Sequence, residues 1–189
     1  MHPFNKLVSR NDADQQRDIT QGRSIAQSRS TTTRMMGLTD ANGQGNVHGG
    51  VIMHMVDEAA AIVAIKHSQC SRVVTARVET FDFLAPAFIG DVVSIPCEMQ
   101  YAGRTSMEIG VKVLAENPRT GEIRHVASSQ VIYVALDDNG KPTPVPPLVP
   151  ANAKEQKIIE RARQRRLSRQ RINEELKQAE ESNEKSEDF

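Results

Sequence analysis

One segment limits the possible folds more than any other. In GNVHGGVIMHMVDEAAAIVAIK, residues 45–66, nearly every position is apolar, yet His54, Asp57 and Glu58 lie in the middle. We predict a helix from about residue 48 to residue 66. A helix that is apolar on most sides must be covered on most sides. Because an unpaired buried carboxylate is costly, Asp57 and Glu58 must reach water or a ligand.

The rest of the chain predicts strands that can cover this helix. One strand is expected before it, at residues 23–36, followed by the turn-rich loop GLTDANGQGN. Four strands are expected after it, in VVTARVETFDFLAP, DVVSIPCEMQY, TSMEIGVKV and HVASSQVIYVAL. Apolar and polar residues alternate in the second and third of these, and the short connection AGR predicts a hairpin. We therefore expect an α+β fold, a curved antiparallel sheet around one helix, with an edge that pairs with a second copy.

Composition and charge limit the domain organisation of the chain and the classes of partner it can bind. We expect a flexible arm at 1–22, a domain at 23–140, a Pro-rich extended linker at 141–150, and a charged C-terminal helix and tail at 151–189. The 24 basic and 24 acidic residues balance, so no overall field favours nucleic acid or a membrane. The C-terminal helix interleaves its charges without aromatics, which also argues against nucleic acid. Two widely spaced cysteines and the lack of a signal or membrane-spanning segment predict a cytoplasmic protein with reduced thiols.

The helix itself suggests a site. At about 100° per residue, Asp57 lies on the same side as Gly50 and Ala61, whose small size leaves room beside the carboxylate. Gly49 and Gly50 open the helix, where free N–H groups can stabilise an oxyanion. Asp57 is about 10 Å along the axis from Gly50, too far for one small group to touch both. This spacing favours a site completed by another subunit.

Several stretches resemble a known family when taken together. DANGQGNVHGG followed by VDEAA, then ARVETFDFLAPAFIGDVV, YAGRTSMEIGVKVLAENPRTGE and VPPLVP, resembles the hotdog-fold acyl-CoA thioesterases over residues 23–150. The resemblance implies dimers joined edge to edge, often three to an assembly. It implies that Asn42 and Asp57 are catalytic and come from opposite subunits. It also places Arg104, Thr105 and Ser106 near coenzyme A.

The activity expected from this resemblance is hydrolysis of acyl-CoA to free fatty acid and coenzyme A. The thioester carbonyl would face Gly49 and Gly50, with Gly50 the stronger donor, and His48 would lie near the ligand mouth. Asp57 would act as general base or as nucleophile, and Asn42 would position water or stabilise charge. No cofactor or metal is expected.

Other interpretations stay open from the sequence. The same fold hosts acyl-thioester hydratases and dehydratases, for which His54 could be recruited, and a non-enzymatic acyl-CoA-binding module is a third class. His54 and Glu58 are expected to be structural, although their spacing could hold a metal. Neither the serines nor the cysteines fit a nucleophilic triad. Coenzyme A carries phosphates that basic side chains could bind, and the candidates are Arg72, Arg77, Arg104, Arg161 and Arg165.

Overall fold

The computed structural model describes residues 17–187, so most of the predicted arm at 1–22 lies outside the described residues. The elements are α2 (Ile25–Ser28), β1 (Ser30–Met35), η2 (Leu38–Asp40), α3 (Gly49–Ser68), β2 (Val73–Phe83), β3 (Val92–Ala102), β4 (Ser106–Glu116), β5 (Ile123–Ala135) and α4 (Ala153–Glu187). None of the helices in this range has an apolar stretch long enough to cross a bilayer.

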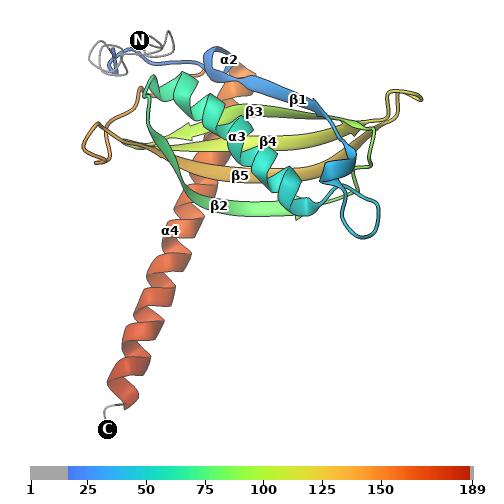
Figure 1. Ribbon diagram of the computed structural model, residues 1–189. Coiled ribbons are helices and arrows are strands. Elements are labelled where there is room, and N and C mark those ends of the chain that lie inside the picture. Colours follow the sequence, from blue (N-terminus) through green and yellow to red (C-terminus); the bar gives the residue numbers. More distant parts are fainter. Residues whose placement is uncertain (1–16, 188–189) are drawn as a thin grey trace, which may run out of the picture.

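The five strands form one antiparallel sheet in the order β1-β3-β4-β5-β2 (Figure 1). The predicted hairpin is present, with Met107 of β4 opposite Ala102 of β3. β2 returns to pair with β5, so that Val74 lies opposite Val134. β1 and β2 are therefore the two edges of the sheet, and the outer side of β2 has no strand partner among the described residues.

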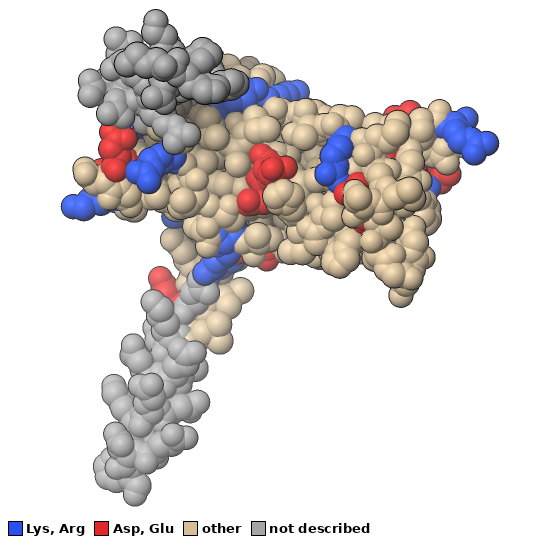
Figure 2. Space-filling view, viewed as in Figure 1, with Lys and Arg blue, Asp and Glu red and all other residues tan. Residues whose placement is uncertain are grey.

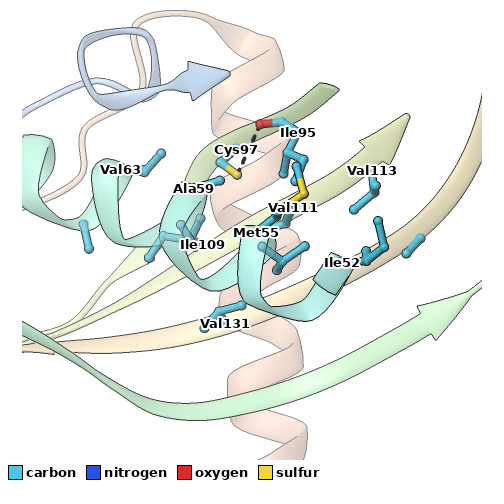
Figure 3. Close-up of a cluster of buried hydrophobic side chains, with 14 of the residues drawn as sticks. Ile52, Met55, Ala59, Val63, Ile95, Cys97, Ile109, Val111, Val113 and Val131 are labelled. Carbon is cyan, nitrogen blue, oxygen red and sulfur yellow. Dashed lines mark hydrogen bonds between the residues drawn. The ribbon is translucent and has the colours of Figure 1, made fainter. Parts of the chain in front are cut away.

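The long helix α3 lies across one face of this sheet, as the sequence predicted. Its buried residues include Ile52, Met55, Ala59 and Val63, which pack against Ile95, Cys97, Ile109, Val111, Val113 and Val131 of the strands (Figure 3). The alternation in β3 predicted its buried face correctly, since Val93, Ile95, Cys97 and Met99 are all at most 2% exposed. The α+β hotdog architecture is thus confirmed.

The predicted first strand, residues 23–36, was wrong in its first half. Residues Ile25–Ser28 form the short helix α2, and the strand begins only at Ser30. A local and a distant side chain cap this short helix. The Gln27 side-chain oxygen accepts a hydrogen bond from the Ser24 backbone N–H at 2.7 Å. Glu155 at the start of α4 is 3% exposed and its carboxylate accepts hydrogen bonds from the backbone N–H groups of Ile25 and Ala26.

The C-terminal helix α4 lies on the face of the sheet opposite α3 (Figure 1). Glu108 of β4 points to this outer face, where it is only 4% exposed and accepts hydrogen bonds from Arg165 and Arg169, each at 2.8 Å. Arg169 also pairs with Glu79 of β2, and Ala162 is fully buried. An ionic network around the buried Glu108 therefore fixes the helix to the sheet.

Candidate functional site

The loop before α3 is folded tightly, and this holds Asn42 in place. The Asn42 side-chain oxygen accepts hydrogen bonds from the backbone N–H groups of Gln44 and Asn46, at 2.9 and 3.1 Å. Gly45 takes a positive φ of 83°, a conformation that glycine adopts without strain. Because the oxygen is used inside the loop, the amide nitrogen of Asn42 is the group left to donate outward.

The first turn of α3 bears on which N–H group could face an oxyanion. His48 is the N-cap residue, and its Nδ1 accepts from the Gly50 N–H at 2.9 Å. The Gly50 N–H therefore has a partner in this arrangement, and the prediction that Gly50 is the stronger oxyanion donor stays a prediction. No described group accepts a hydrogen bond from the Gly49 N–H. His48 acts as a helix cap, a common use of the N-cap side chain.

A cavity of about 380 Å³ opens beside this helix start. Asn42 and Gly49 both line it, whereas Gly50 does not. Most of the remaining lining is apolar and comes from α3, the end of β2 and the loop that follows it: Val47, Ile52, Phe83, Leu84, Ala85, Pro86, Ala87 and Val126, with Asn46. The Phe83 ring covers Gly49, where an added Cβ would lie 3.2 Å from the Cζ atom. The arrangement can hold an apolar chain near one backbone and one side-chain N–H donor.

Asp57 lies on the exposed face of α3, outside this cavity. Its Oδ1 accepts hydrogen bonds from the hydroxyl of Thr75, at 2.6 Å, and from that of Tyr133, at 2.7 Å. Burial raises the pKa of Tyr133 well above its ordinary value, and the nearby Asp57 carboxylate raises it further. Tyr133 therefore stays protonated and orients Asp57. Sequence reasoning missed both Thr75 and Tyr133, and the only signal was a polar ring in the apolar run VIYVA.

Arg104, Thr105 and Ser106 lie at the opposite end of the same chain from the cavity. Ser106 pairs with Val134 of β5, whereas the cavity is lined by Val126 of that strand. Eight residues of strand correspond to about 26 Å. One chain thus brings Asn42 and Gly49 together but neither Asp57 nor the segment 104–106. Among the other cations, Arg72 donates to the Asp138 carbonyl and Arg77 pairs with Glu79.

The side chains that would serve the alternative chemistries have partners outside the cavity or are unreactive. His54 pairs with Glu58 at 3.6 Å, and both are exposed. Within the described part of the chain, no three His, Cys, Asp or Glu residues are grouped to hold a metal ion. Burial raises the pKa of Cys97 to about 12, so its thiol is not an activated nucleophile. The Ser129 hydroxyl donates to the Thr80 carbonyl.

A curved antiparallel sheet around one central helix, with a cavity at the helix start, defines the hotdog class of proteins. The family model of the Thioesterase superfamily matches residues 44–122. A Bacillus subtilis protein named as the uncharacterized acyl-CoA thioester hydrolase YkhA is 41% identical over 125 residues, which are 66% of this chain and 71% of that protein. The chain belongs to the thioesterase superfamily.

Solved structures agree with this assignment. An apo hexameric acyl-CoA thioesterase is 36% identical, with a TM-score of 0.77, and the match covers 81% of this chain and 97% of that one. The Staphylococcus aureus acyl-CoA hydrolase with butyryl coenzyme A, coenzyme A and coenzyme A disulfide is 34% identical, with a TM-score of 0.74, covering 85% and 98%. The human cytosolic acyl coenzyme A thioester hydrolase is 38% identical over 125 residues, but the match spans only a third of its length.

Proposed function

We propose that this chain hydrolyses acyl-CoA thioesters to a free acid and coenzyme A. The observation that carries the proposal is the cavity where Asn42 and the free Gly49 N–H meet an apolar wall. A thioester offers a carbonyl oxygen for the N–H donors and an acyl chain for the wall. The relatives named as acyl-CoA hydrolases, and one with coenzyme A bound, support the substrate class.

The chemical step follows from these groups. Water attacks the thioester carbonyl, and the negative charge that develops on its oxygen is stabilised by the Gly49 N–H at the positive end of α3. Asp57 takes a proton from the water as it attacks, the C–S bond breaks, and the proton passes to the departing thiolate. The Asn42 amide positions the water or donates to the oxyanion. Attack by Asp57 itself, through an anhydride, uses the same groups.

Asp57 reaches this cavity only from a second copy. The exposed face of α3 and the edge strand β2 carry Met53, Ile62, Ile65, Val74 and Val78, all at least 40% exposed. Figure 2 shows the α3 side of the molecule as largely uncharged. Such a face is typical of a surface that a second chain covers. We therefore propose a dimer as the catalytic unit. Relatives described as hexameric support a hexamer, which we propose is made of three such dimers.

Solved structures of variants of one relative support the proposed roles of Asn42 and Asp57. Structures of the Staphylococcus aureus hydrolase include alanine variants of an asparagine and of an aspartate. The two are separated by the same number of positions as Asn42 and Asp57. A third variant of that hydrolase replaces a threonine, the residue type that donates to Asp57 here.

The proposed enzyme needs no cofactor and works in the cytoplasm. Both cysteines are free and buried, which fits a reducing compartment. The proposed chemistry uses only carboxylate, amide and backbone groups. Exhaustive dialysis against a chelator should therefore leave thiol release unchanged.

The test measures thiol release from acyl-CoAs of increasing chain length, with an enoyl-CoA added to detect hydration. Asp57→Asn should lower the turnover about 10²- to 10⁴-fold, the usual contribution of a general base. The asparagine keeps an oxygen to accept from Thr75 and Tyr133, so the variant should fold. Near-normal turnover in Asp57→Asn would contradict the proposal, as would enoyl-CoA hydration in place of hydrolysis.

We propose that the Gly49 N–H is the oxyanion donor, and a matched pair of glycine variants tests this choice. Gly49→Ala adds a Cβ next to the Phe83 ring, at the cavity wall, whereas Gly50→Ala adds one next to His48, outside it. Gly49→Ala should lower the turnover more than Gly50→Ala. The reverse order would return the oxyanion role to Gly50.

A further inference from the structure

Helix α4 has a covered half and an uncovered half. Its first part crosses the outer face of the sheet, where Arg165 and Arg169 contact Glu108 of β4 and Arg169 also reaches Glu79 of β2. After Arg169 the helix passes the β2 edge and continues to Glu187 without a strand beneath it (Figure 1). We call residues 170–187 the α4 arm. It is about 27 Å long, and helices in proteins gain most of their stability from packing an apolar face against other elements.

The arm continues the same face that docks on the sheet. Positions 158, 162, 165, 169, 172 and 176 are spaced alternately by four and three residues, so they form one stripe along the helix. Ala162 in this stripe is fully buried and Arg165 contacts Glu108. Ile172 and Leu176 are 54% and 57% exposed. The stripe therefore carries exposed apolar residues beyond the β2 edge, where no described strand of this chain covers them.

The two halves of α4 have opposite charge. The covered half, AKEQKIIERARQRRLSR, has seven basic and two acidic residues. The arm, QRINEELKQAEESNEKSE, has three basic and six acidic residues. Two such helices attract one another when they lie antiparallel, because each arm then faces the basic half of the other.

A groove for such an arm exists on the outer face. It measures about 730 Å³ and lies between the covered half of α4 and strands β2 and β5. Lys157, Arg161, Gln164 and Ser168 line one side, and Thr80 and Gln130 line the floor. Lys157 and Arg161 form no ion pair with any residue that the structure describes. Glu79 and Glu160 also line the groove, where Glu79 pairs with Arg169 and Glu160 accepts a hydrogen bond from Gln164. The groove therefore offers the positive charge of Lys157 and Arg161 against the one carboxylate of Glu160.

We propose that the α4 arm lies in this groove of a second copy, antiparallel to the partner's α4, across two β2 edges joined by a two-fold axis. The arm's length matches the width of five strands, about 24 Å, so it can span the partner's sheet. A two-fold axis makes the contact reciprocal, because each chain gives one arm and receives one. The contact does not depend on the proposed catalytic chemistry.

Cysteine cross-linking of the full chain tests the geometry. A residue near the two-fold axis lies close to the same residue of the partner chain. Ser168 is the exposed groove-lining residue of α4 that lies nearest the β2 edge, so it should be such a residue. Leu167, about 100° around the helix on the solvent side, is the matched control. Cys70 and Cys97 are both 2% exposed and should not compete. Under mild oxidation, Ser168→Cys should form disulfide-linked dimers at least tenfold faster than Leu167→Cys, and equal rates would overturn the proposal.

Charge-reversal variants test whether the arm of a second copy occupies the groove. Lys157→Glu with Arg161→Glu, and separately Glu174→Lys with Glu175→Lys, should each raise the dissociation constant of the dimer at least tenfold in sedimentation at low salt. Mixing the two variants should restore association, because each arm then faces a groove of opposite charge. Unchanged association in either variant, or no recovery on mixing, would refute the contact. Binding of a DNA duplex that the groove variant abolishes, with association unchanged, would assign the groove to a polyanion instead.

Discussion

Glu108 should contribute measurably to stability, because it joins α4 to the sheet. Its two carboxylate oxygens accept from Arg165 and Arg169, and the carboxylate is almost fully buried. In Glu108→Gln one oxygen remains to accept, so one hydrogen bond to a charged group is lost, worth about 1.5–3 kcal/mol. The Arg165 and Arg169 side chains are 36% and 25% exposed, so water screens part of this interaction energy. We expect a loss of about 2 kcal/mol in the free energy of unfolding.

The assay is denaturant unfolding at fixed protein concentration, since an oligomer's stability depends on it. The same loss should lower the melting temperature by about 4–8 °C. Glu98→Gln is the control. Glu98 is on the neighbouring strand β3, forms no ion pair within the described residues, and should change stability by less than about 0.5 kcal/mol. Equal effects of the two variants would refute the view that the ionic network anchors α4.

Two further predictions concern buried hydrogen bonds. His67 is fully buried between Ser28 and the Pro146 carbonyl, and burial lowers its pKa, so the folded chain favours neutral His67. Stability should therefore be complete above about pH 6.5 and fall as the pH drops below it, by up to about 1.4 kcal/mol per pH unit, and His67→Gln should flatten this slope. Thr75→Val and Tyr133→Phe each remove one donor to Asp57, and each should lower turnover several-fold while KM stays near its normal value. Normal turnover in both variants would show that neither hydroxyl orients Asp57.

Patterns of short range predicted most of the fold. Alternation in β3 and the apolar run of α3 each determine a buried face within one element, and the structure has both. The first strand was mispredicted because a local hydrogen bond between Ser24 and Gln27, and Glu155 more than a hundred residues away, together cap α2. Glu108 could not be predicted as buried, because its burial depends on where α4 docks. Local spacing gave no sign of the ionic network.

The candidate site likewise has parts that the sequence predicted and parts that it could not predict. Asn42 and the helix start were found from the sequence, and both line the cavity. The sequence could not decide between Gly49 and Gly50 as the donor, because the free N–H depends on the rotamer of His48. Thr75 and Tyr133 come from two strands that approach α3 only in the folded chain. Segment 104–106 and Asp57 stay outside the cavity of their own chain, so their roles depend on how copies assemble.

The central claim is that one active site takes Asn42 from one chain and Asp57 from another. Asn42→Ala and Asp57→Ala should each be nearly inactive alone. When they are mixed, unfolded and refolded together, half of the dimers should be mixed, and each mixed dimer regains one intact site of two. Thiol release should therefore recover to about a quarter of the normal rate. If the mixture stays as inactive as its components, the two residues act within one chain and the account is wrong.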